Sequence, residues 1–300
     1  MQIDIRQLRY FVAVAEELHF GRAADKLNIS QPPVTRQVQQ LEYILGSPLF
    51  VRHAKGVSLT AEGTLFLDEA KATLSLLEHA VEKVRHARDG ELGRLDVSIF
   101  GSAVFGRIPE IVLAFRRRYP GVKVVLHTMS KARQMDALIN RSIDVAFNRL
   151  IEPHGALEIE ELLREPLYVA VTEGSPLAEL DKVPFADVLD YPLILFPASN
   201  LPGFVDQVRR MCAKVGIVPN VAQEVGDPVT GLALVASGFG VCVAPQSLLS
   251  VKLAGTVYRP LCDFPGDLSV DLSCVYRRDD ASAVLVNFLS IAREVGATAT

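Results

Sequence analysis

Two adjacent prolines stand at the head of a predicted helix in the stretch NISQPPVTRQVQQLE, residues 28–42. The N–H groups in the first turn of a helix have no partner within the helix, so Pro32 and Pro33 lose no hydrogen bond there, and their fixed φ angle favours the turn. Ser30, two positions earlier, is the predicted N-cap. Apolar residues at helical spacing predict a buried face of Val34, Val38 and Leu41, and the opposite, exposed face is polar: Thr35, Arg36, Gln37 and Gln40.

Two further helices are predicted before this one. Apolar residues recur at three- and four-residue steps from residue 5 to residue 18, and residues 21–27 form a shorter helical segment. Three short helices, the last with an exposed polar N-terminal half, match the order of a helix-turn-helix. The following stretch LFVRHAKGVSLT, residues 49–60, predicts two short strands around a turn at Ala54-Lys55-Gly56. A basic hairpin in this place is typical of a wing.

Residues 64–88 predict a long helix with a heptad repeat. A stripe this narrow is typical of a helix that pairs with another helix, so we expect it to form a dimer interface. The alternative is that the helix packs on its own N-terminal domain. The helix is expected to end at Asp89-Gly90, with Gly93 as a hinge. The dimerisation residues on the stripe are Leu67, Leu74, Leu77, Val81 and Val84.

After Gly93 the pattern alternates between strands and helices. Strands are predicted at 95–100, 122–127, 143–148, 166–171, 192–196, 240–245 and 270–276. This alternation predicts an α/β fold, with a parallel sheet covered by helices on both faces. One interruption divides it into two lobes with a cleft between them. Ligands of such sheets bind at the C-terminal ends of strands, often against helix N-termini.

Four loops follow predicted strand ends: Gly101-Ser102, Met129-Ser130, Asn148-Arg149 and the stretch 197–204. Their hydroxyl groups, the N–H groups at helix starts and the side chain of Arg149 could hold an anion, by preference a carboxylate. An ordinary N-cap is an equal alternative for any single serine. No nucleophile, base or phosphate-binding motif stands in a recognisable context, so no enzymatic activity is predicted.

Charge and composition narrow the class of protein. The 300 residues carry a net charge of −4, and the excess lies beyond residue 95. The island between residues 20 and 56 is basic, with Arg22, Lys26, Arg36, Arg52 and Lys55 against Asp25 and Glu42. We expect a soluble, cytoplasmic protein of two or more domains, because no signal peptide and no apolar run of roughly 20 residues is present. The four cysteines show no metal-binding spacing, so neither a metal nor a cofactor is expected.

The stretch FGRAADKLNISQPPVTRQVQQLEYILGSPLFVR, followed by GVSLTAEG, resembles the DNA-binding domain of LysR-type transcriptional regulators. The heptad segment resembles the linker helix of that family, and the remainder resembles its periplasmic-binding-protein-like effector domain. The resemblance implies a winged helix-turn-helix at 1–62, a linker and dimerisation helix at 63–91 and an effector-binding domain at 92–300. Lobe I would comprise about 92–163 and 268–300, and lobe II about 164–267.

The resemblance also implies that the third helix enters the major groove of promoter DNA and that the wing touches the minor groove or the backbone. Arginine can fork onto guanine and glutamine can pair with adenine, whereas Ser30 and Thr35 could instead bond phosphates. The implied DNA-binding residues are Ser30, Gln31, Pro32, Pro33, Thr35, Arg36, Gln37, Arg52 and Lys55.

Within the family, the segments SQPPVTRQ, FGS, FPAS and CVYRR resemble regulators of catechol, chlorocatechol and benzoate breakdown that respond to muconates. This implies an activator that works as a dimer or dimer of dimers with RNA polymerase, and a muconate-like carboxylate as inducer. The chain departs from the pattern at Lys131, Asn148 and Leu201. Another acidic inducer from a different pathway, or a solute-binding protein, are the alternatives. The implied inducer-binding residues are Ser102, Ser130, Arg149, Asn200, Pro202 and Phe204.

Overall fold

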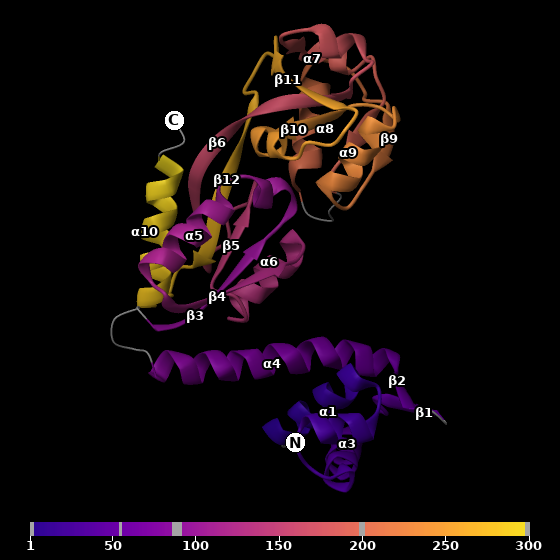
Figure 1. The fold of residues 1–300 in the computed structure, drawn as a ribbon, viewed down its shortest axis with the longest axis vertical. Coiled ribbons are helices and arrows are strands. Elements are labelled where there is room, and N and C mark those ends of the chain that lie inside the picture. Colours follow the sequence, from indigo (N-terminus) through magenta and orange to yellow (C-terminus); the bar gives the residue numbers. More distant parts are fainter. Residues whose placement is uncertain (1–2, 54–55, 86–91, 198–201, 298–300) are drawn as a thin grey trace. The chain divides into compact units, whose positions relative to one another are not determined.

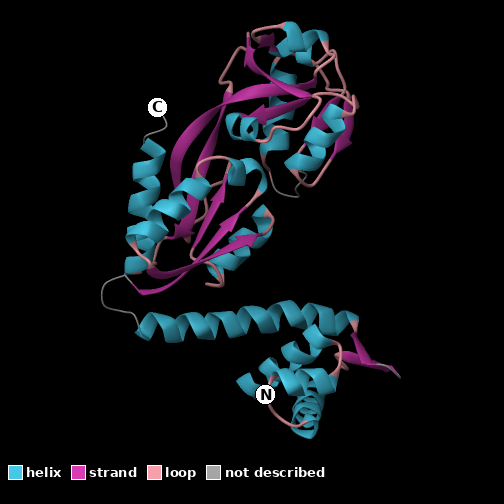
Figure 2. Ribbon diagram, in the orientation of Figure 1, coloured by secondary structure: helices cyan, strands magenta, loops and turns pink. Residues whose placement is uncertain are grey.

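The computed structural model describes residues 3–53, 56–85, 92–197 and 202–297. The chain forms two compact units, Met1–Arg85 and His86–Thr300. Helices dominate the first unit, whereas the second combines helices with a large sheet (Figure 2). Within the described ranges, no helix is long and apolar enough to cross a membrane.

The first unit contains the predicted winged helix-turn-helix (Figure 1). Asp4 starts its first helix, because its carboxylate accepts the N–H of Arg6 at 2.9 Å while its own N–H donates to Gln7 at 2.9 Å. Phe11 is fully buried in the core, with the ring of Phe50 centred 5.4 Å away. The elements are α1 (Ile5–Glu17), α2 (Phe20–Lys26), α3 (Gln31–Leu45), β1 (Phe50–His53), β2 (Gly56–Leu59) and α4 (Ala61–Arg85).

The second unit contains the remaining elements. Its helices are α5 (Ile108–Arg118), α6 (Lys131–Ile139), α7 (Phe185–Val188), α8 (Phe204–Lys214), α9 (Pro228–Ala236) and α10 (Ala283–Ala297). Its strands are β3 (Leu92–Ile99), β4 (Gly121–Thr128), β5 (Val145–Asn148), β6 (Leu157–Thr172), β7 (Val183–Pro184), β8 (Leu193–Leu195), β9 (Val221–Glu224), β10 (Cys242–Pro245), β11 (Thr256–Cys262) and β12 (Ser269–Arg277).

The expectation of a parallel sheet is wrong for much of the second unit. Strand β3 is parallel to β4 and β5, but β12 lies antiparallel between β5 and β6, and β10 and β11 are both antiparallel to β6. The segment between β5 and β6, residues 149–156, is too short for the helical crossover that adjacent parallel strands need. The chain therefore runs on into a long strand, and β12 returns to fill the place beside β5.

The two lobes share their longest strand. The first part of β6 pairs with β12 in lobe I, and its last part pairs with β10 and β11 in lobe II (Figure 1). Helices cover both faces of lobe I, as predicted. Phe147 of β5 packs toward α5 and α10, while its neighbour Ala146 packs toward α6, because successive side chains of a strand point to opposite faces.

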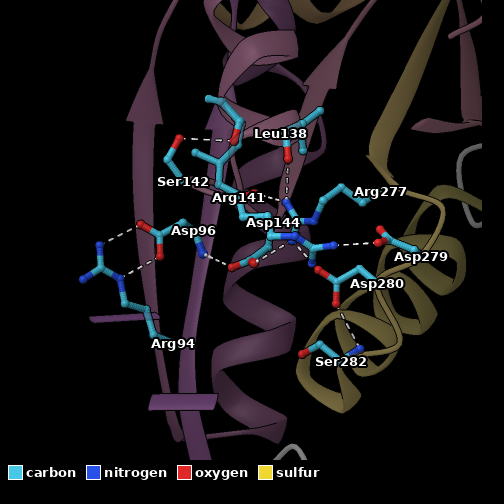
Figure 3. A network of polar contacts seen from close by, with 12 residues as sticks. Arg94, Asp96, Leu138, Arg141, Ser142, Asp144, Arg277, Asp279, Asp280 and Ser282 are labelled. Atoms are coloured by element: carbon cyan, nitrogen blue, oxygen red, sulfur yellow. Dashed lines mark hydrogen bonds and ion pairs between the residues drawn. The ribbon is translucent and has the colours of Figure 1, made fainter. Parts of the chain in front are cut away.

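A buried polar network closes the base of lobe I (Figure 3). Arg277, at the end of β12 and within the CVYRR segment, forms ion pairs with Asp144 at 3.2 Å and with Asp280. Asp144 also accepts the main-chain N–H of Asp96 at 3.0 Å, and Arg94 bonds both carboxylate oxygens of Asp96 at 2.6 and 2.8 Å. Because each buried charge has a partner of opposite sign, the network can join β3, β5 and β12 without leaving an unpaired charge in the core.

Candidate nucleic-acid interface and ligand pocket

The start of α3 differs from the expectation in one respect. Ser30 occupies the N-cap position with extended backbone, but its side chain makes no capping hydrogen bond. An N-cap hydroxyl normally accepts from the N–H groups of the second or third helical residue. Those residues are Pro32 and Pro33, which have no N–H, so the predicted N-cap position is confirmed but the Ser30 hydroxyl has no N–H to accept there. The hydroxyl is exposed instead.

The rest of the α3 surface is polar and open. Gln31 and Arg36 are exposed, and Thr35 and Gln37 are half-buried. No carboxylate of the described residues forms an ion pair with Arg36, so its guanidinium group can form new hydrogen bonds. The two cations of α2 differ from Arg36 in this respect.

Acidic residues of α1 form ion pairs with the basic residues of α2. Lys26 lies 3.1 Å from a carboxylate oxygen of both Glu16 and Glu17, and these hydrogen bonds raise the pKa of Lys26. Arg22 lies 3.8 Å from Glu17 and also donates to its main-chain carbonyl. The basic island predicted from the sequence is therefore smaller in the structure, and Arg36 and Arg52 are its cations without an ion pair among the described residues.

Glu42 fixes the wing to α3. One carboxylate oxygen of Glu42, in α3, accepts the N–H of Leu49 at 2.8 Å and of Phe50 at 3.2 Å. The hairpin pairs Phe50 with Leu59 and His53 with Gly56. Arg52 lies on β1 with its guanidinium carbon 5.3 Å from the centre of the Phe20 ring. Lys55, the other predicted wing residue, lies outside the described residues.

Helix α4 presents two apolar faces. Leu67 and Leu74 of the heptad stripe pack against the core of their own unit, Leu77 is half-buried and Val81 is 43% exposed. The side chain of Val84 lies outside the described part of the chain. Leu67 and Leu74 therefore pack within their own unit, as the alternative to a dimer interface predicted.

Leu65 and Leu76 form the second apolar face of α4. They are 72% and 41% exposed, and they are separated by about three helical turns, which places them on the same side of the helix. Leu67 and Leu74 point to the other side. The first unit therefore leaves the side chains of Leu65 and Leu76 uncovered.

Three of the four loops predicted to hold an anion contribute residues to one pocket in the second unit, and Lys131, which follows the fourth loop, also lines it. The pocket is partly open to solvent. Lobe I contributes the ends of β3 and β5 and the start of α6, and lobe II contributes the residues after β8 and the start of α8. The lining residues are Phe100, Gly101, Ser102, Lys131, Asn148, Arg149, Pro197, Gly203 and Phe204.

Arg149 lines this pocket but is held by other groups. It is 6% exposed and forms an ion pair with Glu165, and it donates to the carbonyl oxygen of Asp271 at 2.9 Å and to the hydroxyl of Ser247 at 3.2 Å. Its charge is therefore neutralised by the protein. Only its Nε atom is buried without a hydrogen-bond partner among the described residues.

Asn148 is held by a chain of side-chain amides. Its Nδ2 donates to Gln134 at 2.7 Å, and Gln134 donates to the hydroxyl of Ser98 at 3.0 Å. The carbonyl oxygen of its own side chain accepts the N–H of Arg149 at 2.8 Å. The floor of the pocket is therefore rigid, because each of these buried polar side chains is fixed by its neighbour.

Lys131 is the second cation of the pocket. It is the first residue of α6 and is 5% exposed. Its ammonium group donates to the carbonyl oxygen of Leu150 at 3.1 Å and of Pro202 at 2.6 Å. Burial lowers the pKa of Lys131, although Asp271, Asp206 and Glu152 attract its charge from a distance.

Two family models match the chain. Residues 5–64 match the bacterial regulatory helix-turn-helix protein of the lysR family, and residues 88–297 match the LysR substrate binding domain. The chain belongs to the LysR family. This LysR-type regulator is a DNA-binding transcriptional regulator by family, so the prediction that it is not an enzyme is confirmed.

Relatives and solved structures agree with this assignment. The transcriptional regulator TfdS of Cupriavidus pinatubonensis is 38% identical over 97% of this chain and 98% of its own length. The crystal structure of full-length CbnR complexed with target DNA is 32% identical, with a TM-score of 0.82 over 97% of this chain and 99% of that one. The BenM effector binding domain with its effector benzoate is 28% identical, with a TM-score of 0.62 over 68% of this chain and 92% of that one.

The structure of this LysR-type regulator places the expected inducer residues in different surroundings. Ser102, Arg149 and Phe204 line the pocket together. Ser130 is exposed at the N-cap of α6 and does not line it, and Pro202 contributes to a neighbouring pocket. Asn200 lies outside the described residues.

Lys131, which in the sequence is only a departure from the family pattern, lies in the pocket wall. A lysine at the first position of a helix that follows a strand end was the available signal, because ligands of such sheets collect there. Cys212, Cys242 and Cys274 are buried free thiols, and burial raises the pKa of Cys242 to about 12. Cys262 is half-buried.

Proposed function

We propose that this LysR-type regulator activates an operon for the breakdown of an aromatic compound when a small carboxylate occupies the pocket of its effector domain. The observation that carries the proposal is the lining of the pocket. The buried ammonium group of Lys131 lines the same pocket as Phe100 and Phe204, while the charge of Arg149 is neutralised by Glu165. A pocket that combines apolar walls with a few placed polar groups suits a small organic acid.

The similarity to the BenM effector binding domain with its effector benzoate supports this inducer class. The resemblance to muconate-responsive regulators makes a muconate-like acid the other candidate. A regulator of a different pathway, with another small acidic inducer, is the alternative within the family.

Promoter DNA is the proposed macromolecular partner. In this proposal α3 reads bases with Gln31, Arg36 and Gln37, while the exposed hydroxyl of Ser30 bonds a phosphate. Glu42 fixes the wing relative to α3, so that one rigid unit meets two parts of the duplex. The similarity to the DNA-bound CbnR structure supports this arrangement.

A dimer completes the proposal. Two copies double the small basic island and read two half-sites, as is common among helix-turn-helix proteins. We propose that α4 forms the dimer interface with its uncovered apolar face, Leu65 and Leu76. Boundaries at 62/63 and 91/92 between the three proposed domains, and assembly into a dimer of dimers, remain part of the proposal.

A mobility-shift assay with the promoter region next to the regulator's own gene tests the DNA-binding part. We expect a sequence-selective shift whose mobility changes when benzoate or cis,cis-muconate is added. A shift that is equal on unrelated DNA of the same length would contradict specific recognition. A selective shift that no small carboxylate alters would contradict the effector class and leave the DNA-binding part standing.

A substitution in the pocket tests the effector part separately. Ser102 is buried at the pocket wall and far from α3 in the sequence, so Ser102→Ala should weaken effector binding in calorimetry and leave operator affinity without effector unchanged. Equal effector affinity in the variant and the parent protein would argue against this pocket as the effector site.

A further inference from the structure

The ammonium group of Lys131 is buried without a counterion. Among the described residues, no carboxylate lies within the 4.0 Å of an ion pair, and its two hydrogen-bond acceptors are neutral main-chain carbonyls, those of Leu150 and Pro202. A buried charge without a partner of opposite sign is costly, and proteins usually keep one only where a ligand completes it.

The acidic residues that attract Lys131 form no hydrogen bond with it in the described structure. Asp271 accepts the N–H of Leu150 at 2.9 Å and the hydroxyl of Ser273 at 2.6 Å. Asp206 accepts the N–H of Gly203 at 2.8 Å, at the start of α8. Glu152 is exposed. These groups attract the lysine through space, but none of them is hydrogen-bonded to it in the described structure.

Arg149 does not take the place of Lys131 as an anion receptor. Its ion pair with Glu165 cancels its charge, and its terminal nitrogens are occupied by Glu165, Asp271 and Ser247. Lys131 is thus the one uncompensated cation among the residues that line the pocket. Among the described residues of its wall, the pocket therefore offers one cation to a negative charge and no second cation for another.

The position of Lys131 adds to this preference. An ammonium group has three N–H donors, and two of them meet carbonyls, one in lobe I and one in lobe II. Its main chain begins α6, where N–H groups without intrahelical partners favour an anion, and the Ser130 side chain does not cap that end. A carboxylate in the pocket therefore meets a charged donor and a favourable helix end together.

Resting on the proposed function, we propose that Lys131 is the specificity-determining residue of the pocket and selects an aromatic effector with a single carboxylate. The carboxylate accepts a hydrogen bond from the third N–H of Lys131, while the ring lies against Phe100 and Phe204. Dicarboxylates bind less well, because the pocket offers their second charge no uncompensated cation.

Isothermal titration calorimetry on the full-length regulator tests this assignment with benzoate, benzamide and cis,cis-muconate. Benzamide has the shape of benzoate without its charge. We expect the parent protein to bind benzoate about tenfold or more tightly than benzamide, since a hydrogen bond to a charged group contributes that much. It should also bind benzoate more tightly than muconate. Equal affinity for benzoate and benzamide would overturn the proposal without any variant.

Two variants separate the charge of Lys131 from its bulk. Lys131→Met keeps a long side chain without charge, and Lys123→Met removes an exposed lysine of β4 as the matched control. We expect Lys131→Met to abolish the preference for benzoate over benzamide, and Lys131→Arg and Lys123→Met to retain it. Circular dichroism establishes that each variant is folded.

The outcomes distinguish this assignment from the proposed function. If folded Lys131→Met binds benzoate as the parent does, Lys131 is not the selecting residue, although the regulator still responds to an aromatic acid. If the parent prefers muconate, the single-carboxylate preference is wrong and the effector class stands. If the parent binds none of the three compounds, the proposed effector class fails and this inference fails with it.

Discussion

The carbonyl oxygen of Leu49 occupies the space where a side chain of residue 63 would begin, because a Cβ atom on Gly63 would stand 2.1 Å from it. The same carbonyl accepts the N–H of Thr60 at 3.0 Å, and the Thr60 hydroxyl accepts the N–H of Gly63 at 2.8 Å. The glycine of the GVSLTAEG motif thus lets the start of α4 rest directly on the strand that begins the wing.

Gly63→Ala should therefore destabilise the DNA-binding unit by about 1–3 kcal/mol, since the clash is with main chain and a backbone shift must relieve it. Thermal unfolding followed by circular dichroism measures the effect. Gly155→Ala is the matched control, because a Cβ there meets no atom within 4 Å. A melting temperature that falls equally in both variants would mean that the Leu49 contact is not the cause.

Arg36→Lys should lose sequence selectivity and keep general affinity for DNA. Lysine keeps the charge of Arg36 but lacks the fork that bonds one base at two points, which contributes about 1–3 kcal/mol of discrimination. Competition binding with operator and random duplexes at fixed salt measures both quantities. Arg36→Ala should weaken binding to both duplexes, and equal selectivity of the lysine variant and the parent would refute a base contact.

Leu76→Glu should prevent dimer formation and Leu74→Glu should destabilise the fold, although the two residues are two positions apart on α4. Leu76 is exposed, so its substitution should change stability by less than about 0.5 kcal/mol while it prevents dimer formation. Leu74 packs on the core of its own unit, so its substitution should lower the melting temperature of that unit. Light scattering measures the mass, and a Leu76→Glu protein that stays dimeric would exclude this face of α4.

Protonation of Glu160 should weaken the effector unit in acid. Arg293 bonds its two carboxylate oxygens at 2.6 and 2.8 Å, and these hydrogen bonds lower the pKa of Glu160 below its ordinary value of 4.5. The pair therefore contributes stability above pH 4.5, and that contribution is lost as the pH falls through the lowered pKa. Glu160→Gln should flatten the fall in urea midpoint between pH 5 and pH 3, whereas exposed Glu179→Gln should not.

Much of the fold could be predicted from periodicity, because both units bury regular apolar faces. The strands that were not predicted are those whose sequence lacks a regular alternation of apolar and polar residues. The first part of β6 carries Glu158, Glu160 and Glu161 and is only half-buried for most of its length, so its charges conceal a strand. Strand β11 contains Pro260 and is half-buried at nearly every position. The antiparallel return of β12 depends on contacts distant in sequence.

The loops that form the candidate site could be predicted from the sequence, but which of its charged side chains are free to bind a ligand could not. Strand ends indicated where Ser102, Arg149 and Phe204 would meet, because topology alone brings such loops together. Whether an arginine is free to bind a ligand depends on a residue elsewhere in the chain, and Glu165 gave no sign in the sequence that it would pair with Arg149. The loss of the Ser30 cap, by contrast, follows from the two prolines themselves.

The long strand β6 has a consequence for how lobe II can be exchanged between relatives. The chain leaves lobe I at Pro166 and returns at Ser269, and these two residues are partners across the sheet. The next pair inward is also joined, since Leu167 donates to the carbonyl oxygen of Leu268 at 2.8 Å. The two ends of lobe II therefore lie side by side. Replacing residues 167–268 with the corresponding segment of a relative needs only two junctions, and these are adjacent in the sheet.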